Sequence, residues 1–190
     1  MANPTLLPVI RDLKNGRVGI LPTDTIYGIV GSALRPAAVQ RIYLLRERNP
    51  KKPMIILIGS VRDLVRFGVA GNASTRQILR NVWPGTVSVV LPIAPRRRAA
   101  RRTFRYLHRG TNTLAFRLPK PAWLRSLLKT TGPLVAPSAN FEGEPPSRTI
   151  ARAKRYFGDR VDFYVDMGRS ASKPSRLLRI ENGAVIVLRK

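Results

Sequence analysis

Two hydrophobic periodicities alternate along this chain, one of about 3.6 residues and one of two. In residues 5–15, apolar side chains recur at helical spacing up to Gly16, whereas the run MIILI at 54–58 is typical of a buried strand. The same criteria predict helices over residues 5–15, 36 to about 46–48, 60–68, 73–82, 121–130 and 149–157. They predict strands over residues 17–21, 54–58, 87–93, 113–118, 133–136, 161–166, 176–180 and 184–188.

The order of these segments predicts an α/β fold. Helices and strands interleave without a strict βαβ repeat, and two apolar strands follow one another closely at the end, so we expect a mixed parallel/antiparallel sheet flanked by helices. No repeat or composition break divides the 190 residues, which are enough for a proper core. We therefore expect one domain over residues 1–190.

Composition excludes several classes of chemistry. The chain has no cysteine, which rules out disulfides and thiolate metal sites. A single histidine and ten carboxylates disfavour a catalytic zinc ion or a Ser-His-Asp triad. The first residues lack a basic region followed by a long apolar core, and no apolar run approaches membrane-spanning length. We therefore expect no membrane partner and a cytoplasmic location.

The charge is strongly positive and uneven. Lys and Arg number 35 against 10 acidic residues, a net charge of +25. No acidic residue occurs between Asp63 and Glu142, and residues 96–109 alone contain seven arginines. One interpretation of this segment is a basic arm for tRNA or other RNA, in which Phe104 and Tyr106 could stack on bases. The other is a solvated loop with its aromatic residues in the core.

Four short motifs carry candidate chemistry, although each is also typical of an ordinary turn or strand face. PTDTIYG at 22–28 follows a strand, is expected to form a loop bracketed by Pro22 and Gly28, and offers hydroxyls and a carboxylate to a small polar ligand. RERNPKKP at 46–53 places four cations within seven residues, which suits a triphosphate. TLAFR at 113–117 puts Thr113, Ala115 and Arg117 on one strand face. SAN at 138–140 follows another strand end, where open α/β sheets bind ligands.

The chemistry of such a site would be positioning and charge neutralisation. The chain has neither a P-loop nor a GxGxxG motif, so side chains would have to hold phosphate. No nucleophile–base pair is evident, and we expect no distinct catalytic side chain.

Taken together, these residues resemble the YrdC family of threonylcarbamoyl-AMP synthases, in its short, single-domain branch. The resemblance covers nearly the whole chain: PTDTIYG, a basic Lys-x-Arg-type motif, WPG at 83–85, Thr-x-x-x-Arg, Ser-x-Asn followed by PPSRT, Pro174-Ser175, and a terminal arginine. It implies a twisted mixed sheet with a basic concave cleft.

The family resemblance also implies a nucleotidyltransferase reaction. Threonine and bicarbonate form an N-carboxy amino acid, whose carboxylate attacks the α-phosphate of Mg-bound ATP to give threonylcarbamoyl-adenylate and pyrophosphate. Downstream proteins transfer the carbamoyl group to adenosine 37 of tRNA. By position, threonine would contact Thr23, Arg117 and Ser175. ATP would contact Arg46, Arg48, Thr113, Ser138, Asn140, Thr149 and Arg189, and Mg²⁺ would sit on the ATP phosphates without protein ligands.

One residue departs from the family pattern. Arg46 stands where the family usually has Lys, as it does in a related branch that tends to lose the Ser-x-Asn motif, which is intact here. If Arg46 lines the triphosphate site as a simple cation, Lys should serve about as well. The alternatives to a synthase are an RNA-binding protein with the same fold and a divergent family member without this activity.

Overall fold

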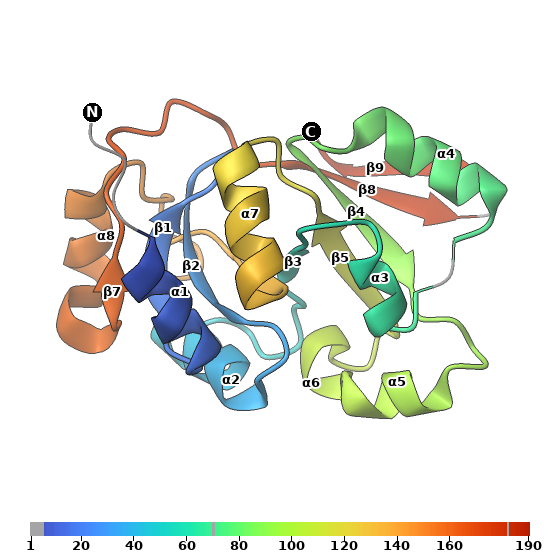
Figure 1. Ribbon diagram of the computed structural model, residues 1–190, viewed down its shortest axis with the longest axis horizontal. Coiled ribbons are helices and arrows are strands. Elements are labelled where there is room, and N and C mark those ends of the chain that lie inside the picture. The colour runs from blue at the N-terminus through green and yellow to red at the C-terminus, as the bar shows by residue number, and fades with distance from the viewer. Residues whose placement is uncertain (1–5, 70, 182) are drawn as a thin grey trace.

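The sheet is the centre of the fold. The computed structural model describes residues 6–69, 71–181 and 183–190, and its strands form one nine-stranded sheet in the order β7-β1-β2-β6-β3-β5-β4-β8-β9 (Figure 1). The pairs β3·β5, β4·β8 and β1·β7 are parallel and the others are antiparallel. The strands are β1 (Gly19–Pro22), β2 (Tyr27–Ser32), β3 (Ile55–Leu57), β4 (Val87–Pro92), β5 (Thr113–Arg117), β6 (Leu134–Val135), β7 (Phe163–Tyr164), β8 (Arg176–Glu181) and β9 (Ala184–Arg189). The predicted mixed sheet is confirmed.

Helices cover both faces of this sheet. They are α1 (Leu7–Lys14), α2 (Pro36–Leu45), α3 (Asp63–Arg66), α4 (Ala73–Val82), α5 (Arg98–Thr103), α6 (Arg105–His108), α7 (Ala122–Thr131), α8 (Ile150–Phe157) and the 3₁₀ turn η1 (Gly158–Arg160). Among the described residues, no helix has the length and apolarity needed to cross a membrane.

Side chains of the central strands point alternately to the two faces of the sheet and so contribute to two separate hydrophobic cores. In β3, Ile56 packs into the larger core with α2, α3, α4, α6 and α8, while Leu57 packs into a smaller core with α1 and α7. Strand side chains point to opposite faces in turn, so a strand buried on both sides is apolar throughout. The smaller core covers only part of its face, because α1 and α7 lie over β1, β2, β6 and β3 (Figure 1).

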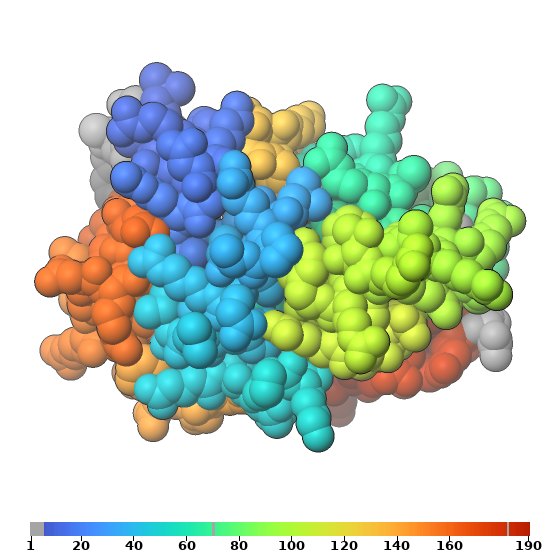
Figure 2. Space-filling view, turned by 90° about the horizontal axis from the view of Figure 1, so that it is seen from below, coloured from blue at the N-terminus to red at the C-terminus, as the bar shows by residue number. Residues whose placement is uncertain are grey.

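Two segments differ from the sequence predictions. Residues 22–28 were expected to form a loop, but the chain reverses within 23–26 and β2 begins at Tyr27, antiparallel to β1. The strand YGIVGS contains two glycines, and because glycine has low β propensity, the sequence pattern does not predict a strand there. The basic segment, expected to be a basic arm or a solvated loop, forms the helices α5 and α6 (yellow-green in Figure 2), anchored by buried Phe104 and Leu107.

Other predicted elements are present but shorter. The strand expected over 161–166 contributes only Phe163–Tyr164 to the sheet, and that over 133–136 only Leu134–Val135. The helix expected over 60–68 is the single turn Asp63–Arg66. The length of these strands is set by the neighbouring strand, because a residue joins the sheet only where its backbone can hydrogen-bond to an adjacent backbone.

Candidate functional site

A cavity of about 270 Å³ opens on the part of the sheet that α1 and α7 leave uncovered. Its walls come from the turn between β1 and β2, the segment after α2, the segment after β6, and the end of β9. Four arginines line it and no carboxylate does: Arg46, Arg48, Arg117 and Arg189. Arginine is the side chain best suited to planar contacts with carboxylate and phosphate, so the cavity is built for an anionic ligand.

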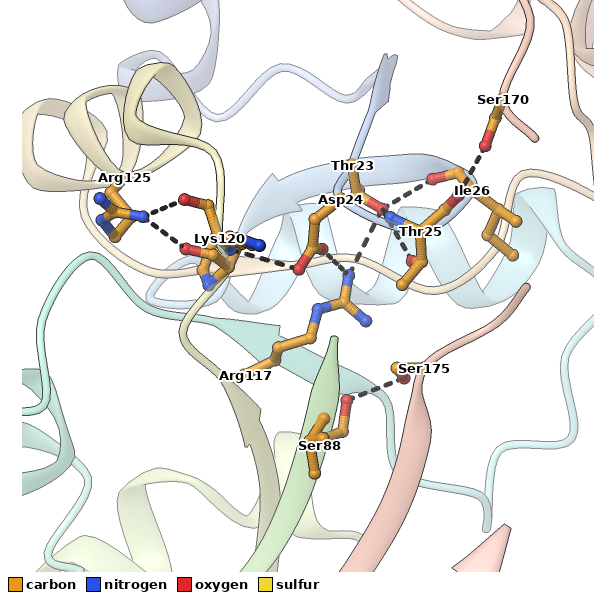
Figure 3. Close-up of polar contacts among 12 residues, drawn as sticks. Thr23, Asp24, Thr25, Ile26, Ser88, Arg117, Lys120, Arg125, Ser170 and Ser175 are labelled. Atoms are coloured by element: carbon orange, nitrogen blue, oxygen red, sulfur yellow. Dashed lines mark hydrogen bonds and ion pairs between the residues drawn. The ribbon is translucent and has the colours of Figure 1, made fainter. Parts of the chain in front are cut away.

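Arg117, which lines the cavity, is held by the turn between β1 and β2 (Figure 3). Its Nη2 lies 3.1 Å from Asp24 Oδ1 and donates to Thr23 Oγ1 at 3.4 Å. The Arg117 and Asp24 side chains are only 4% and 3% exposed. Burial lowers the pKa of Arg117, and the neighbouring Asp24 opposes that shift. The ion pair keeps a buried cation charged beside a threonine hydroxyl.

Arg46 joins helix α2 to the loop after β6. Its Nε donates to the backbone oxygens of Ser138 (2.8 Å) and Asn140 (3.0 Å), and its Nη2 donates to Ser138 Oγ (3.2 Å). Its Nη1 is buried without a partner among the described residues. Burial, followed by repulsion from Arg48, lowers the pKa of Arg46 to about 10, so the guanidinium remains charged at neutral pH.

Arg48 and Glu142 fix the segment that follows α2. Arg48 donates through Nη2 to the Pro53 backbone oxygen at 2.8 Å. Glu142 accepts from the Asn49 backbone N–H and from Lys52 Nζ, each at 2.6 Å. These contacts lower the pKa of Glu142, the Lys52 hydrogen bond contributing most. The carboxylate thus ties the cation-rich segment to the loop that carries Ser138.

Ser175 and Arg189 close the far side of the cavity. Arg189 donates to the Ser175 backbone oxygen from Nε (3.0 Å) and Nη2 (2.8 Å), and to Ser175 Oγ at 3.2 Å. Ser175 Oγ also lies 3.0 Å from Ser88 Oγ, a buried contact (Figure 3). Burial lowers the pKa of Arg189. These hydrogen bonds hold the Arg189 guanidinium, at the end of β9, against the segment before β8 and so place a positive charge in the cavity wall.

Seven of the ten predicted site residues meet in this cavity: Thr23, Arg46, Arg48, Arg117, Ser138, Ser175 and Arg189. The other three do not line it. Thr113 lies at the opposite end of β5 from Arg117 and donates to Thr111 Oγ1. Thr149 caps α8 by accepting from Arg152 N–H. Asn140 is buried beneath the loop, where its Nδ2 donates to the backbone oxygens of Phe141 and Glu144.

Sequence reasoning missed two supporting carboxylates and the apolar floor. Asp24 lies within the PTDT motif, but nothing local indicates that it faces Arg117, which is 93 residues away in the chain. Glu142 gave no signal except that acidic residues are rare in its region. The floor consists of Ile55, Ala115 and Leu177, from three strands. Of these three, only Ala115 was expected from the sequence, because strand alternation puts it on the same face as Arg117.

The fold and the cavity define an α/β protein with an arginine-lined cavity, suited to a small anion, on a part of the mixed sheet that α1 and α7 leave uncovered. Comparison with protein-family models identifies the family. The model of the Sua5/YciO/YrdC family, described as "Telomere recombination", matches residues 11–190. The chain belongs to this family.

Relatives and solved structures agree with that assignment. A threonylcarbamoyl-AMP synthase of Thiobacillus denitrificans is 31% identical over 175 residues, covering 92% of this chain and 90% of that protein. A putative threonylcarbamoyl-AMP synthase of Mycobacterium tuberculosis is 29% identical over 165 residues, covering 87% of this chain and 73% of that protein. P. abyssi Sua5 complexed with L-threonine superposes with a TM-score of 0.82 at 25% identity; the match covers 96% of this chain and 52% of Sua5, so this chain spans about half of Sua5. E. coli YciO, 19% identical, has the same fold, with a TM-score of 0.83 over 99% of this chain and 91% of YciO.

Proposed function

We propose that this protein is an L-threonylcarbamoyladenylate synthase, a nucleotidyltransferase. In this reaction the amino group of L-threonine takes up bicarbonate with loss of water, and the resulting carbamate oxygen attacks the α-phosphate of ATP. Pyrophosphate leaves with the electrons of the broken P–O bond, and threonylcarbamoyl-AMP remains. The observation that carries the proposal is the convergence of four arginines, with no carboxylate, on one small cavity. Relatives named as synthases of this compound support the choice of reaction.

The residues divide by the ligand that they would contact. Thr23 and Arg117 lie together and suit the hydroxyl and carboxylate of threonine. Arg46, Arg48 and Arg189 would neutralise the phosphates, and Ser138 and Ser175 would offer hydroxyls to ATP and to threonine, respectively. Charge neutralisation and alignment would lower the barrier, because the pyrophosphate leaving group accumulates negative charge.

Magnesium would arrive with the nucleotide. Among the described residues, no group of three His, Cys, Asp or Glu could hold a metal ion. Of the two carboxylates that support the site, Asp24 is ion-paired with Arg117 and Glu142 with Lys52. Mg²⁺ prefers phosphate oxygens and water and needs few protein ligands in nucleotide sites, so the residues fit a metal carried by ATP. When bound, Mg²⁺ would supply further neutralisation of the triphosphate.

The product would serve tRNA modification. Threonylcarbamoyl-AMP is a mixed anhydride, which suits the transfer of its threonylcarbamoyl group, with release of AMP, to an amine by downstream proteins acting at adenosine 37 of tRNA. ATP, L-threonine and bicarbonate are then the small-molecule partners. The cytoplasm, where ATP and tRNA occur together, stays the expected location.

A reconstituted turnover tests the proposal. Purified protein with Mg-ATP, bicarbonate and L-threonine should release pyrophosphate and form an adenylate with the mass of threonylcarbamoyl-AMP. Omitting threonine or bicarbonate should abolish both signals. Protein that binds ATP by calorimetry but yields no adenylate under these conditions would contradict a synthase and favour a divergent family member.

A further inference from the structure

Two serine hydroxyls meet beneath one wall of the cavity. Ser175 lines the cavity, whereas Ser88, on β4, does not line it and is completely buried. Their Oγ atoms lie 3.0 Å apart (Figure 3). Within the part of the chain that the structure describes, this is the only side-chain hydrogen bond of Ser88. The ligand contacts proposed above give Ser88 no role.

The surroundings of Ser88 determine which hydroxyl donates. A serine hydroxyl has one hydrogen and two lone pairs. If Ser175 donated, the hydrogen of Ser88 would be buried with no acceptor among the described residues, and an unsatisfied buried polar group costs about 1–3 kcal/mol. If Ser88 donates, its hydrogen is satisfied. Ser88 is therefore the donor, and Ser175 is the acceptor.

Arg189 occupies the second lone pair of Ser175. Its Nη2 lies 3.2 Å from Ser175 Oγ, and a guanidinium can only donate. The hydrogen of Ser175 is then its one free hydrogen-bonding position, and the cavity is the space into which it can point. Ser175 thus presents a donor to the ligand, with a positive charge beside it. Hydrogen bonds that a hydroxyl accepts also polarise its own O–H, which strengthens it as a donor.

The sheet holds Ser88 in place under Ser175. β4 is paired on both sides, with β5 and with β8, and Ser88 lies opposite Leu177. Ser175 precedes β8 and is not part of this ladder. The orientation of the Ser175 hydroxyl therefore depends on the two side chains that donate to it, Ser88 and Arg189.

We propose that Ser88 is a positioning residue that fixes Ser175 as a donor, so that this end of the cavity selects N-carboxythreonine over threonine itself. The proposal rests on the synthase reaction proposed above. The ammonium group of threonine has only hydrogens to offer, so it cannot accept from Ser175, and Arg189 repels it. Carbamate oxygens are anionic acceptors. Ser175 would hold the carbamate oxygen that does not attack ATP, which leaves the other oxygen free to react.

Kinetics of pyrophosphate release test the role of Ser88. In Ser88→Ala, KM for bicarbonate should rise about fivefold, the equivalent of one hydrogen bond of about 1 kcal/mol, while KM for ATP stays as in wild type. Ser175→Ala should raise KM for bicarbonate at least as much, and adding Ser88→Ala to it should have no further effect, because Ser88 acts only through Ser175. Ser32→Ala removes another buried strand hydroxyl, outside the cavity, and should leave both KM values unchanged.

Calorimetry tests the selection without turnover. L-threonine is titrated into each protein in bicarbonate-containing and bicarbonate-free buffers of the same pH and ionic strength. Bicarbonate should tighten threonine binding to wild type and to Ser32→Ala, and should do so much less in Ser88→Ala. Without bicarbonate, the three proteins should bind threonine equally. Thermal unfolding of each variant confirms that it is folded.

Four outcomes would overturn the role of Ser88: no effect of bicarbonate on threonine binding to wild type, equal rises in both KM values in Ser88→Ala, the same losses in Ser32→Ala, or additive losses in the Ser88 and Ser175 double variant. The synthase proposal fails separately. A wild type whose threonine binding responds to bicarbonate through Ser88, but which forms no adenylate, would contradict only the synthase.

Discussion

At the scale of single residues, the cavity depends on guanidinium groups that bind the protein itself as well as any ligand. Arg46 spans two backbone oxygens and one hydroxyl of the loop after β6. Arg117 is neutralised by Asp24. A planar fork with several donors can do this while still offering N–H groups to the cavity, whereas a point ammonium cannot.

Replacing Arg46 by Lys tests this interpretation. The sequence alone favoured unchanged or better activity, but the contacts predict a loss, because Lys cannot reach Ser138 O, Asn140 O and Ser138 Oγ together. Each charged hydrogen bond lost costs about 1.5 kcal/mol, so KM for ATP should rise by about tenfold or more. Initial rates of pyrophosphate release for wild type, Arg46→Lys and Arg46→Ala measure it. Arg41→Lys, on the same helix but outside the cavity, is the control. Wild-type kinetics in Arg46→Lys would show that charge alone is needed.

Arg117 should have separable structural and ligand-binding roles. Arg117→Ala leaves Asp24 buried and unpaired, so the free energy of unfolding should fall by about 3 kcal/mol, and threonine affinity should fall more than ATP affinity. Adding Asp24→Asn removes the stranded charge and should restore much of the stability but not the threonine affinity. Denaturant unfolding and titration calorimetry measure the two effects. Recovery of threonine binding in the double variant would mean that Arg117 only neutralises Asp24.

At the scale of elements, the site is a junction of loops held by long-range contacts. The segment after α2 and the loop after β6 are joined by Arg46 and by Glu142, and the end of β9 is joined to the segment before β8 by Arg189. Each of these segments begins at the end of a helix or strand of the core, which fixes where it starts. The contacts between loops then set the width of the cavity.

Glu142→Gln should loosen one of these junctions in a pH-dependent manner. The folded-state pKa of Glu142 is lowered, so its ionised form stabilises the fold above the unfolded value of 4.5, and this contribution is lost as pH falls through the folded pKa. At pH 7 the variant should be less stable by about 0.5–1 kcal/mol, and the difference from wild type should shrink in acid below pH 4.5. Urea unfolding of both proteins from pH 3 to pH 7 measures it. A constant difference across this range would exclude the carboxylate as its source.

At the scale of the whole molecule, a large positive charge coexists with an apolar sheet edge. β9 ends the sheet, and four consecutive residues in it, Val185 to Leu188, are each 41–46% exposed. A flat apolar edge of this kind is a template for pairing with another chain. The net charge of +25 opposes self-association, but only while salt does not screen it.

Salt should therefore reveal association through β9. Static light scattering should rise with sodium chloride concentration for wild type, because at 0.1 M the screening length is already about 10 Å. Val187→Lys places a charge on the free edge and should suppress the rise. Val65→Lys, which replaces a 70% exposed valine on α3, should not. Equal suppression by both variants would point to net charge and away from the edge.

The sequence by itself determined the mixed α/β class, the set of polar motifs and most of the helices and strands, β2, α5 and α6 excepted. Local physics explains this success. The hydrophobic period and the positions of proline and glycine determine backbone conformation over only a few residues. Pro36 could therefore mark the start of α2, and the apolar run at 54–58 could mark β3. The motifs also lie at element ends, which is where α/β sheets place ligands.

Only the tertiary structure decided which motif residues reach the cavity. Thr113 and Arg117 share a strand and a face, yet they are four positions apart, a rise of about 13 Å, and only Arg117 lies at the cavity end. The Asp24–Arg117 ion pair, the role of Arg46 as a clamp and the helical form of the basic segment likewise depend on contacts between residues far apart in the chain. Local patterns carry no information about such contacts, because the packing of the sheet and its helices brings the partners together.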